Sequence, residues 1–134
     1  MKKEIKTTKA PEAIGPYSQG IFTDGSSRLI FLSGQIPVNP ADGTVPEGIE
    51  AQTKQVFENI KAILATKKGY LDDIVKTTVF MKNLDDFAAM NAVYAEQFKK
   101  PYPARSTVEV AALPKGVLIE IEVIALDINP ALRG

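Results

Sequence analysis

Apolar side chains recur at helical spacing in the middle of the chain. The stripe consists of Val56, Phe57, Ile60, Ile63 and Leu64, with charged residues between its members. Positions three or four residues apart lie on one face of a helix, so this pattern predicts an amphipathic helix. The helix is predicted to end at Lys67-Lys68-Gly69, where cations suit the last turn and the glycine can adopt the left-handed conformation.

A second helix is predicted after residue 83. Asn83 can cap its first turn, and Asp85 and Asp86 place negative charge where the helix dipole favours it. Its apolar stripe consists of Phe87, Met90, Tyr94 and Phe98.

Strands are predicted where apolar and β-branched residues alternate or run together between turns. The predicted ranges are 3–8, 17–23, 28–33, 74–82, 105–110 and 118–127. The segment Asp24-Gly25-Ser26-Ser27 is typical of a turn, so 17–23 and 28–33 are predicted to form a β-hairpin.

This order of elements indicates the α+β class. We expect a mixed, mainly antiparallel sheet of about six strands with two helices on one face, and a single domain over residues 1–134. The other face should also be buried, because residues 29–32 are apolar at every position and Ile119, Ile121 and Val123 alternate along their strand. Since the helices cover one face only, other copies of the chain are expected to cover the second, which predicts a homo-oligomer.

Three residue types are absent: the 134 residues include no Cys, no His and no Trp. Thiolate and imidazole chemistry, and metal sites built on those ligands, are therefore excluded. The formal net charge is zero, with 16 cations and 16 anions, which argues against a nucleic-acid partner. Without a long apolar run or the apolar stretch of a secretory leader, a cytoplasmic protein with no membrane span is expected.

Arginine is rare, with Arg28, Arg105 and Arg133 beside thirteen lysines. Arg105 directly follows Pro101-Tyr102-Pro103-Ala104 and opens an apolar strand. A guanidinium held at such a position presents a planar fork that matches a carboxylate or a phosphate. A structural salt bridge would explain the same residue.

The other candidates lie at the ends of predicted elements or on their polar faces. Glu120 and Glu122 project to one side of an otherwise apolar strand, where a carboxylate can act as acid or base or simply face solvent. Tyr17 and Ser33 lie at strand–loop junctions, where pocket mouths form but where turn chemistry also selects polar residues. Asn91 interrupts the helical face of Phe87 and Tyr94, so its amide either satisfies a neighbouring group or reaches a ligand.

Five segments together resemble the Rid family (reactive intermediate deaminase, also called YjgF or L-PSP). They are residues 13–20 (AIGPYSQG), 33–37 (SGQIP), 74–80 (IVKTTVF), 103–106 (PARS) and 119–122 (IEIE). The resemblance covers essentially the whole chain. It implies a chorismate-mutase-like homotrimer with sites at the subunit clefts. It also implies hydrolysis of 2-imino acids, released by pyridoxal-phosphate enzymes, to 2-keto acids and ammonia, without a metal or an organic cofactor.

The resemblance also implies roles for individual residues. Arg105 would bind the substrate carboxylate, Glu120 would hold the attacking water, and the carbonyl of Thr107 would accept from the imine nitrogen. The residues lining the cleft would be Tyr17, Ser33, Asn91 and Gly34, the last through its N–H. Many members have Cys at the position of Thr107, so this chain departs from the family there, and its pocket shape and substrate range become less certain.

Two alternatives to an imine hydrolase follow from the same residues. The Arg105 cleft would also suit a module that binds a 2-keto acid without turnover, because only Glu120 separates catalysis from binding. RNA cleavage, a label long attached to this family, is poorly supported, since the chain has neither histidine nor a basic stripe.

Overall fold

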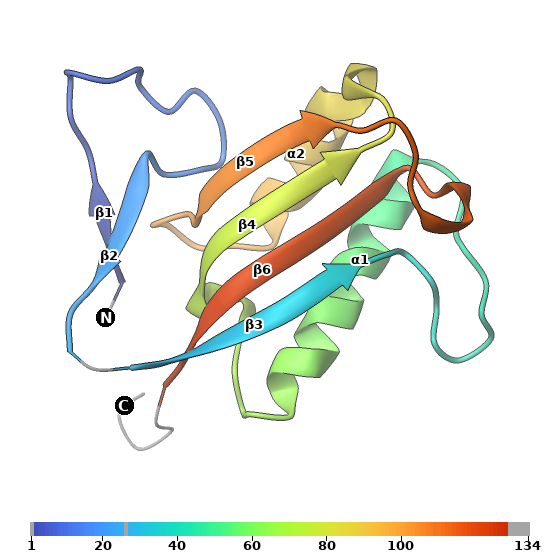
Figure 1. The fold of residues 1–134 in the computed structure, drawn as a ribbon, viewed down its shortest axis with the longest axis horizontal. Coiled ribbons are helices and arrows are strands. Elements are labelled where there is room, and N and C mark those ends of the chain that lie inside the picture. Colours follow the sequence, from blue (N-terminus) through green and yellow to red (C-terminus); the bar gives the residue numbers. More distant parts are fainter. Residues whose placement is uncertain (1, 26, 129–134) are drawn as a thin grey trace.

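The computed structural model describes residues 2–25 and 27–128. It contains β-strands and two α-helices (Figure 1). In chain order these are β1 (Lys2–Ile5), β2 (Gly20–Thr23), β3 (Arg28–Gln35), α1 (Ile49–Ala65), β4 (Ile74–Met81), α2 (Phe87–Glu96), β5 (Ala104–Glu109) and β6 (Ile119–Asp127). The predicted α+β class with two helices is confirmed.

The main sheet has four strands in the order β3-β6-β4-β5, and both helices lie behind it in Figure 1. Only β4 and β5 run parallel, while β6 pairs antiparallel with both of its neighbours. Strands β1 and β2 form a separate two-stranded sheet, so the prediction of one sheet of about six strands is wrong. Strand β5 is consequently an edge strand of the main sheet.

The predicted hairpin between β2 and β3 is also wrong. β2 pairs with β1, with Glu4 opposite Ile21, and β3 pairs with β6, with Leu32 opposite Val123. Pairing with β6 places Leu32, which is 7% exposed, in the core beneath the helices, which a hairpin with the short β2 would not do. Burial therefore overrides the local turn signal of residues 24–27.

Helix α1 buries the stripe that the sequence predicts, except that Ile63 remains 38% exposed. At its end the left-handed residue is Lys68, at φ 56°, so the prediction that Gly69 takes this conformation is wrong. A glycine is nevertheless favoured at position 69, because there is little room for a side chain there. Its N–H donates to the Leu64 carbonyl at 2.9 Å, and a Cβ there would lie 3.2 Å from that oxygen.

The predicted cap at residue 83 is present but serves a single 3₁₀ turn, Leu84–Asp86, that precedes α2. The side chain of Asn83 accepts from the N–H of Asp85 at 2.9 Å.

The two faces of the main sheet differ in burial. Ile119, Ile121 and Val123 of β6 are 0–2% exposed and pack in the core with the helices, so they do not mark the second face as the sequence suggested. On the opposite face, Leu29 and Phe31 of β3 are 52% and 69% exposed. That face, called the open face below, exposes these apolar side chains in the described part of the chain.

Neither helix in the described part of the chain combines the length and the hydropathy needed to cross a bilayer.

Candidate functional site

Arg105 lies near the start of the edge strand β5 and points to the helix side of the sheet. In the parallel register it is opposite Thr77 of β4, which is fully buried beneath the helices. Paired residues in a sheet project to the same face, so the guanidinium extends toward α2.

Three aromatic rings surround the Arg105 guanidinium. Its carbon lies 4.8 Å from the ring centre of Tyr94, 5.4 Å from that of Tyr17 and 5.5 Å from that of Phe87. Its Nη1 donates to Oδ1 of Asn91 at 2.7 Å. Phe87, Asn91 and Tyr94 are spaced i, i+4 and i+7 on α2, which explains why one helical face supplies three of the four contacts.

The electrostatics of Arg105 favour an anionic ligand. Burial lowers the pKa of the guanidinium, but an arginine remains a cation at physiological pH. Among residues 2–25 and 27–128, no carboxylate lies within ion-pair distance of it. Arg28, by contrast, pairs with Asp127 at 2.9 Å. The salt-bridge explanation therefore applies to Arg28 and not to Arg105, while Arg133 lies outside the described residues.

Tyr17 reaches Arg105 because two neighbouring residues fix its loop. The N–H of Ser18 donates to the Pro103 carbonyl at 3.1 Å, and its hydroxyl donates to the Tyr102 carbonyl. Gln19 closes the loop on itself, accepting from the N–H of Thr7 at 2.7 Å and donating to the Pro11 carbonyl at 2.6 Å. Sequence reasoning gave Ser18 and Gln19 no individual role, although both lie within a motif that carries the resemblance.

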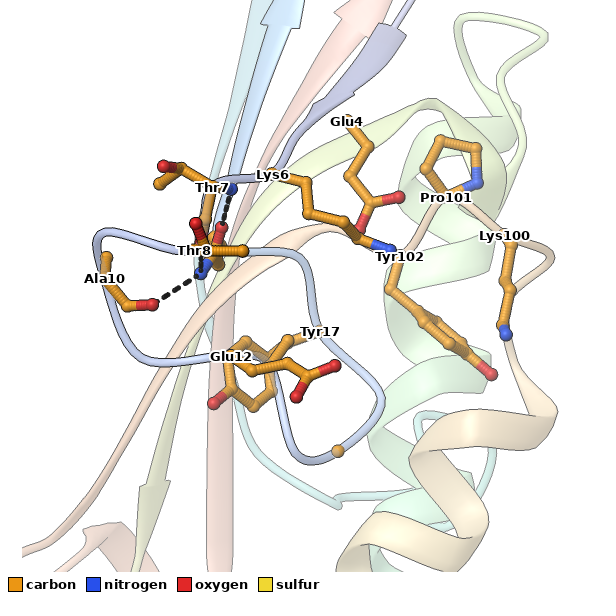
Figure 2. A pocket seen from close by; sticks show the side chains of 13 residues that line it. Glu4, Lys6, Thr7, Thr8, Ala10, Glu12, Tyr17, Lys100, Pro101 and Tyr102 are labelled. Carbon is orange, nitrogen blue, oxygen red and sulfur yellow. Dashed lines mark hydrogen bonds between the residues drawn. The ribbon is translucent and has the colours of Figure 1, made fainter.

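A cavity of about 600 Å³ lies between this loop and residues 100–102. Glu4, Lys6 and Tyr102 are on one side of it, and Glu12 and Tyr17 are on the other (Figure 2). It shares Gly15 and Tyr17 with the surroundings of Arg105 but does not include the guanidinium.

Glu120 belongs to a second group of residues, on the opposite face of the sheet. It is opposite Phe80 of β4, whereas the next residue, Ile121, is buried on the helix side. Its carboxylate lies against Gly34, because a Cβ added to Gly34 would be 1.9 Å from Oε2 of Glu120. The register of β3 against β6 shifts between Leu32 and Gln35, so Gly34 lies in an irregular segment of β3, where glycine allows close approach.

The remaining predicted residues divide between these two groups. Ser33 is exposed beside Gly34, and Glu122 is exposed on the same face of β6 as Glu120. Thr107 is on β5 two residues after Arg105, and its buried hydroxyl has no hydrogen-bond partner among the described residues.

The main chain of Thr107 faces the outer edge of the sheet. The N–H of Val110 donates to Met81 of β4 at 2.9 Å, and main-chain groups alternate in direction along a strand. The carbonyl of Thr107 therefore points away from β4.

Sequence reasoning missed Phe87, Tyr94 and Thr77 as parts of the Arg105 site. The signal was the polar Asn91 on the apolar face of α2, but the strand that this face meets depends on the sheet order, which the sequence does not reveal. No group of three or more acidic residues that could hold a metal ion occurs in the described part of the chain.

Residues 7–127 match the family described as Endoribonuclease L-PSP. The chain belongs to the L-PSP family. The predicted resemblance is thus confirmed over nearly the whole chain.

Relatives within the L-PSP family have different names. An Escherichia coli protein named 2-iminobutanoate/2-iminopropanoate deaminase is 52% identical over 129 residues, which cover 94% of this chain and 98% of that one. The Lactococcus lactis protein AldR, named as a candidate regulator, is 54% identical over 124 residues, or 92% and 96% of the two chains. The crystal structure of E. coli TdcF with bound serine is similar at a TM-score of 0.71, with 47% identity over 92% and 98%.

Proposed function

We propose that this protein hydrolyses 2-imino acids to 2-keto acids and ammonia, with Arg105 binding the substrate carboxylate. The observation that carries the proposal is a half-buried guanidinium with aromatic walls and no carboxylate partner among the described residues. Asn91 accepts a hydrogen bond from Nη1 of Arg105, which uses one N–H of the guanidinium. The other N–H groups remain for two charge-assisted hydrogen bonds to a carboxylate. Binding an anion there offsets the cost of burying the cation.

The chemistry needs little more than orientation. In the iminium form of the substrate, the carbon of the C=NH₂⁺ group is already electrophilic. Water adds to this carbon, and one of its protons passes to the nitrogen. The C–N bond then breaks with its electron pair leaving on nitrogen while the new hydroxyl becomes the keto group, and the released ammonia takes the hydroxyl proton, so the products are the 2-keto acid and ammonium. Glu120 would hold and deprotonate the water, and the Thr107 carbonyl would accept from the nitrogen. No metal or organic cofactor is required for these steps.

The site would be shared between copies of the chain. Arg105 and Glu120 project from opposite faces of the sheet, and their strands are two positions apart, or roughly 10 Å. One chain cannot direct both side chains at one substrate. We therefore propose a homotrimer whose clefts combine Arg105, Tyr17, Asn91 and Thr107 of one chain with Glu120, Gly34 and Ser33 of another. The exposed Leu29 and Phe31 of the open face would contribute to the contact.

The names of two relatives support this reading. One relative is named as a deaminase of two 2-imino acids, and another crystallised with serine, which also carries a carboxylate. We propose that the present chain serves amino-acid metabolism in the cytoplasm.

The alternative is a module that binds a small carboxylate without turnover. The regulator name of AldR favours it, and the surroundings of Arg105 would serve both functions equally. Only Glu120 distinguishes the two, because a sensor needs no residue that activates water.

The test couples threonine dehydratase to release of 2-ketobutyrate, with semicarbazide competing for the imine. The hydrolase predicts faster 2-ketobutyrate release with the wild-type chain and loss of the acceleration in Arg105→Ala. No acceleration by the wild type, together with binding of 2-ketobutyrate, would establish the binding module instead. RNA binding that is absent or insensitive to salt would exclude the endoribonuclease reading of the family description.

A further inference from the structure

Two buried hydroxyl groups meet on the helix side of the sheet, next to the residues that surround Arg105. Oγ1 of Thr77 lies 2.7 Å from the hydroxyl of Tyr94, and both residues are 0% exposed. Thr77 is on β4, directly opposite Arg105 in the sheet, and Tyr94 is on α2. The hydrogen bond therefore joins the strand beside Arg105 to the helix whose ring the guanidinium contacts.

We infer that the Thr77–Tyr94 hydrogen bond fixes the Tyr94 ring as the floor on which the Arg105 guanidinium is oriented for a carboxylate. Thr77 and Tyr94 are thus positioning residues. This inference rests on the proposed role of Arg105 as the carboxylate anchor.

Tyr94 is the most firmly held of the three rings. Phe87 is 37% exposed, and Tyr17 extends from a loop, whereas Tyr94 is fully buried. The Tyr94 ring also packs on Phe98 at 5.0 Å and on Phe57 at 5.6 Å between ring centres. It is also the ring closest to the guanidinium, at 4.8 Å.

The apolar contacts of Tyr94 leave its hydroxyl dependent on Thr77. Phe57 and Phe98 pack on the ring but offer no hydrogen-bond acceptor to the phenol. A buried hydroxyl that loses its partner is costly, so the ring would shift or admit water to satisfy it. The guanidinium, whose carbon lies 4.8 Å from the centre of this ring, would shift with it. Asn91 holds an edge of the guanidinium, at 2.7 Å, and cannot by itself fix the plane.

The bond persists over the pH range in which an enzyme works. Burial raises the pKa of Tyr94 to about 12, so the phenol stays neutral and can either donate or accept in the hydrogen bond with Thr77. The floor beneath Arg105 is therefore uncharged, and the cation retains its positive charge for the ligand.

The test removes the bond from either side and measures substrate and product affinity. Thr77→Val retains the shape of the side chain without its hydroxyl, and Tyr94→Phe retains the ring. Each is expected to raise the KM for the imine and the Kd for 2-ketobutyrate by between about threefold and tenfold, with kcat changed by less than about twofold. Thr77→Ser, which keeps the hydroxyl, is expected to restore both constants.

Two further variants separate positioning from stability. The double variant with Thr77→Val and Tyr94→Phe should be no worse in KM than either single variant, because each removes the same bond. Thr53→Val is the matched control. The hydroxyl of Thr53, also 0% exposed, donates to the Ile49 carbonyl at 2.7 Å on α1, so this variant should lower the melting temperature but leave KM and Kd unchanged.

Different results contradict the inference and the proposed function. If Thr77→Val and Tyr94→Phe lose stability as Thr53→Val does while KM and Kd stay at wild-type values, the pair is merely structural and the inference is wrong. If the wild-type chain binds 2-ketobutyrate without turnover, the proposed hydrolase activity is wrong. The Kd values of the variants for 2-ketobutyrate still test whether the Thr77–Tyr94 pair positions Arg105. A wild-type chain that neither binds nor turns over would overturn both.

Discussion

The two faces of the main sheet differ in how their candidate site residues are surrounded. On the helix side, residues from β4, β5 and α2 form a packed surround for Arg105, with three rings and an amide already in contact with the guanidinium. On the open face, Glu120 lies against the backbone of Gly34 near exposed apolar residues of β3. The first region surrounds its cation with residues of one chain, whereas the second resembles part of an interface.

This difference leads us to expect that one region binds the substrate and the other activates the water. Among the described residues, no carboxylate lies within ion-pair distance of the Arg105 guanidinium, so we expect this region to bind a carboxylate but not to activate water. We expect the Glu120 region to supply the group that activates water. Variants in the first region should therefore act mainly on affinity, and variants in the second should act mainly on turnover.

The largest loss of activity is expected from removing the Arg105 side chain. Arg105→Ala should lower kcat/KM by about a thousandfold, since two charge-assisted hydrogen bonds to the carboxylate are lost. Arg28→Ala is the matched control, because Arg28 pairs with Asp127 and its side chain is 82% exposed. Steady-state kinetics of both variants would check this, and an active Arg105→Ala would contradict the role of Arg105.

The next effect concerns the open face. Glu120→Gln keeps the shape of the side chain but cannot take a proton, so kcat should fall at least about a hundredfold with KM little changed. Glu122→Gln provides the comparison, since Glu122 is exposed two residues further along β6. Equal losses in the two variants would mean that the carboxylates act through charge or folding and not through the site.

Alkaline pH should destabilise the helix side. Burial raises the pKa of Tyr94 to about 12, from an ordinary value of 10.0. The neutral phenol is favoured in the folded state, so its stabilisation is complete below pH 10 and is lost as the pH rises toward 12. Denaturation by urea should show roughly 3 kcal/mol more loss over this range in the wild type than in Tyr94→Phe. Identical pH profiles for the two proteins would contradict the burial of this hydroxyl.

The smallest effect tests how Gly34 supports Glu120. A methyl group at Gly34 would lie 1.9 Å from Oε2 of Glu120, which is the flexible end of that side chain, so the carboxylate should move and the backbone should not. Gly34→Ala should fold normally and lower kcat by about tenfold. Gly20→Ala, whose added methyl would meet Ile5 at an ordinary 3.4 Å, should be neutral in kinetics and in thermal unfolding. A Gly34→Ala chain with full kcat would show that Glu120 need not be held there.

Sequence patterns predicted where the helices and strands lie better than they predicted which strands pair in the sheet. Helix α1 and strands β4 and β6 follow from periodic apolar residues, because burial of those residues determines each element locally. The pairing of β3 with β6 did not follow, since partners 86 to 99 residues apart in the chain leave no local signal, while the turn at residues 24–27 suggested a nearby partner.

The same limit applies to the candidate site. Arg105 was a candidate because a rare arginine follows a rigid segment, and Asn91 because it interrupts an apolar face, but only the family resemblance favoured a functional role over a structural one. That these two residues meet, and that Glu120 projects from the other face, depends on the order of the strands. Alternation within β6 shows which residues share a face with Glu120 but not which face Arg105 occupies.

Arg105 and Glu120 are expected to act together only across two chains. Arg105→Ala and Glu120→Gln chains, each inactive alone, would be mixed in denaturant, refolded together and assayed with threonine dehydratase. Half of the chains then offer an intact Arg105 and half of their neighbours an intact Glu120, so we expect about a quarter of wild-type activity. A refolded mixture of normal size that stays as inactive as its parents would contradict a site shared between two chains.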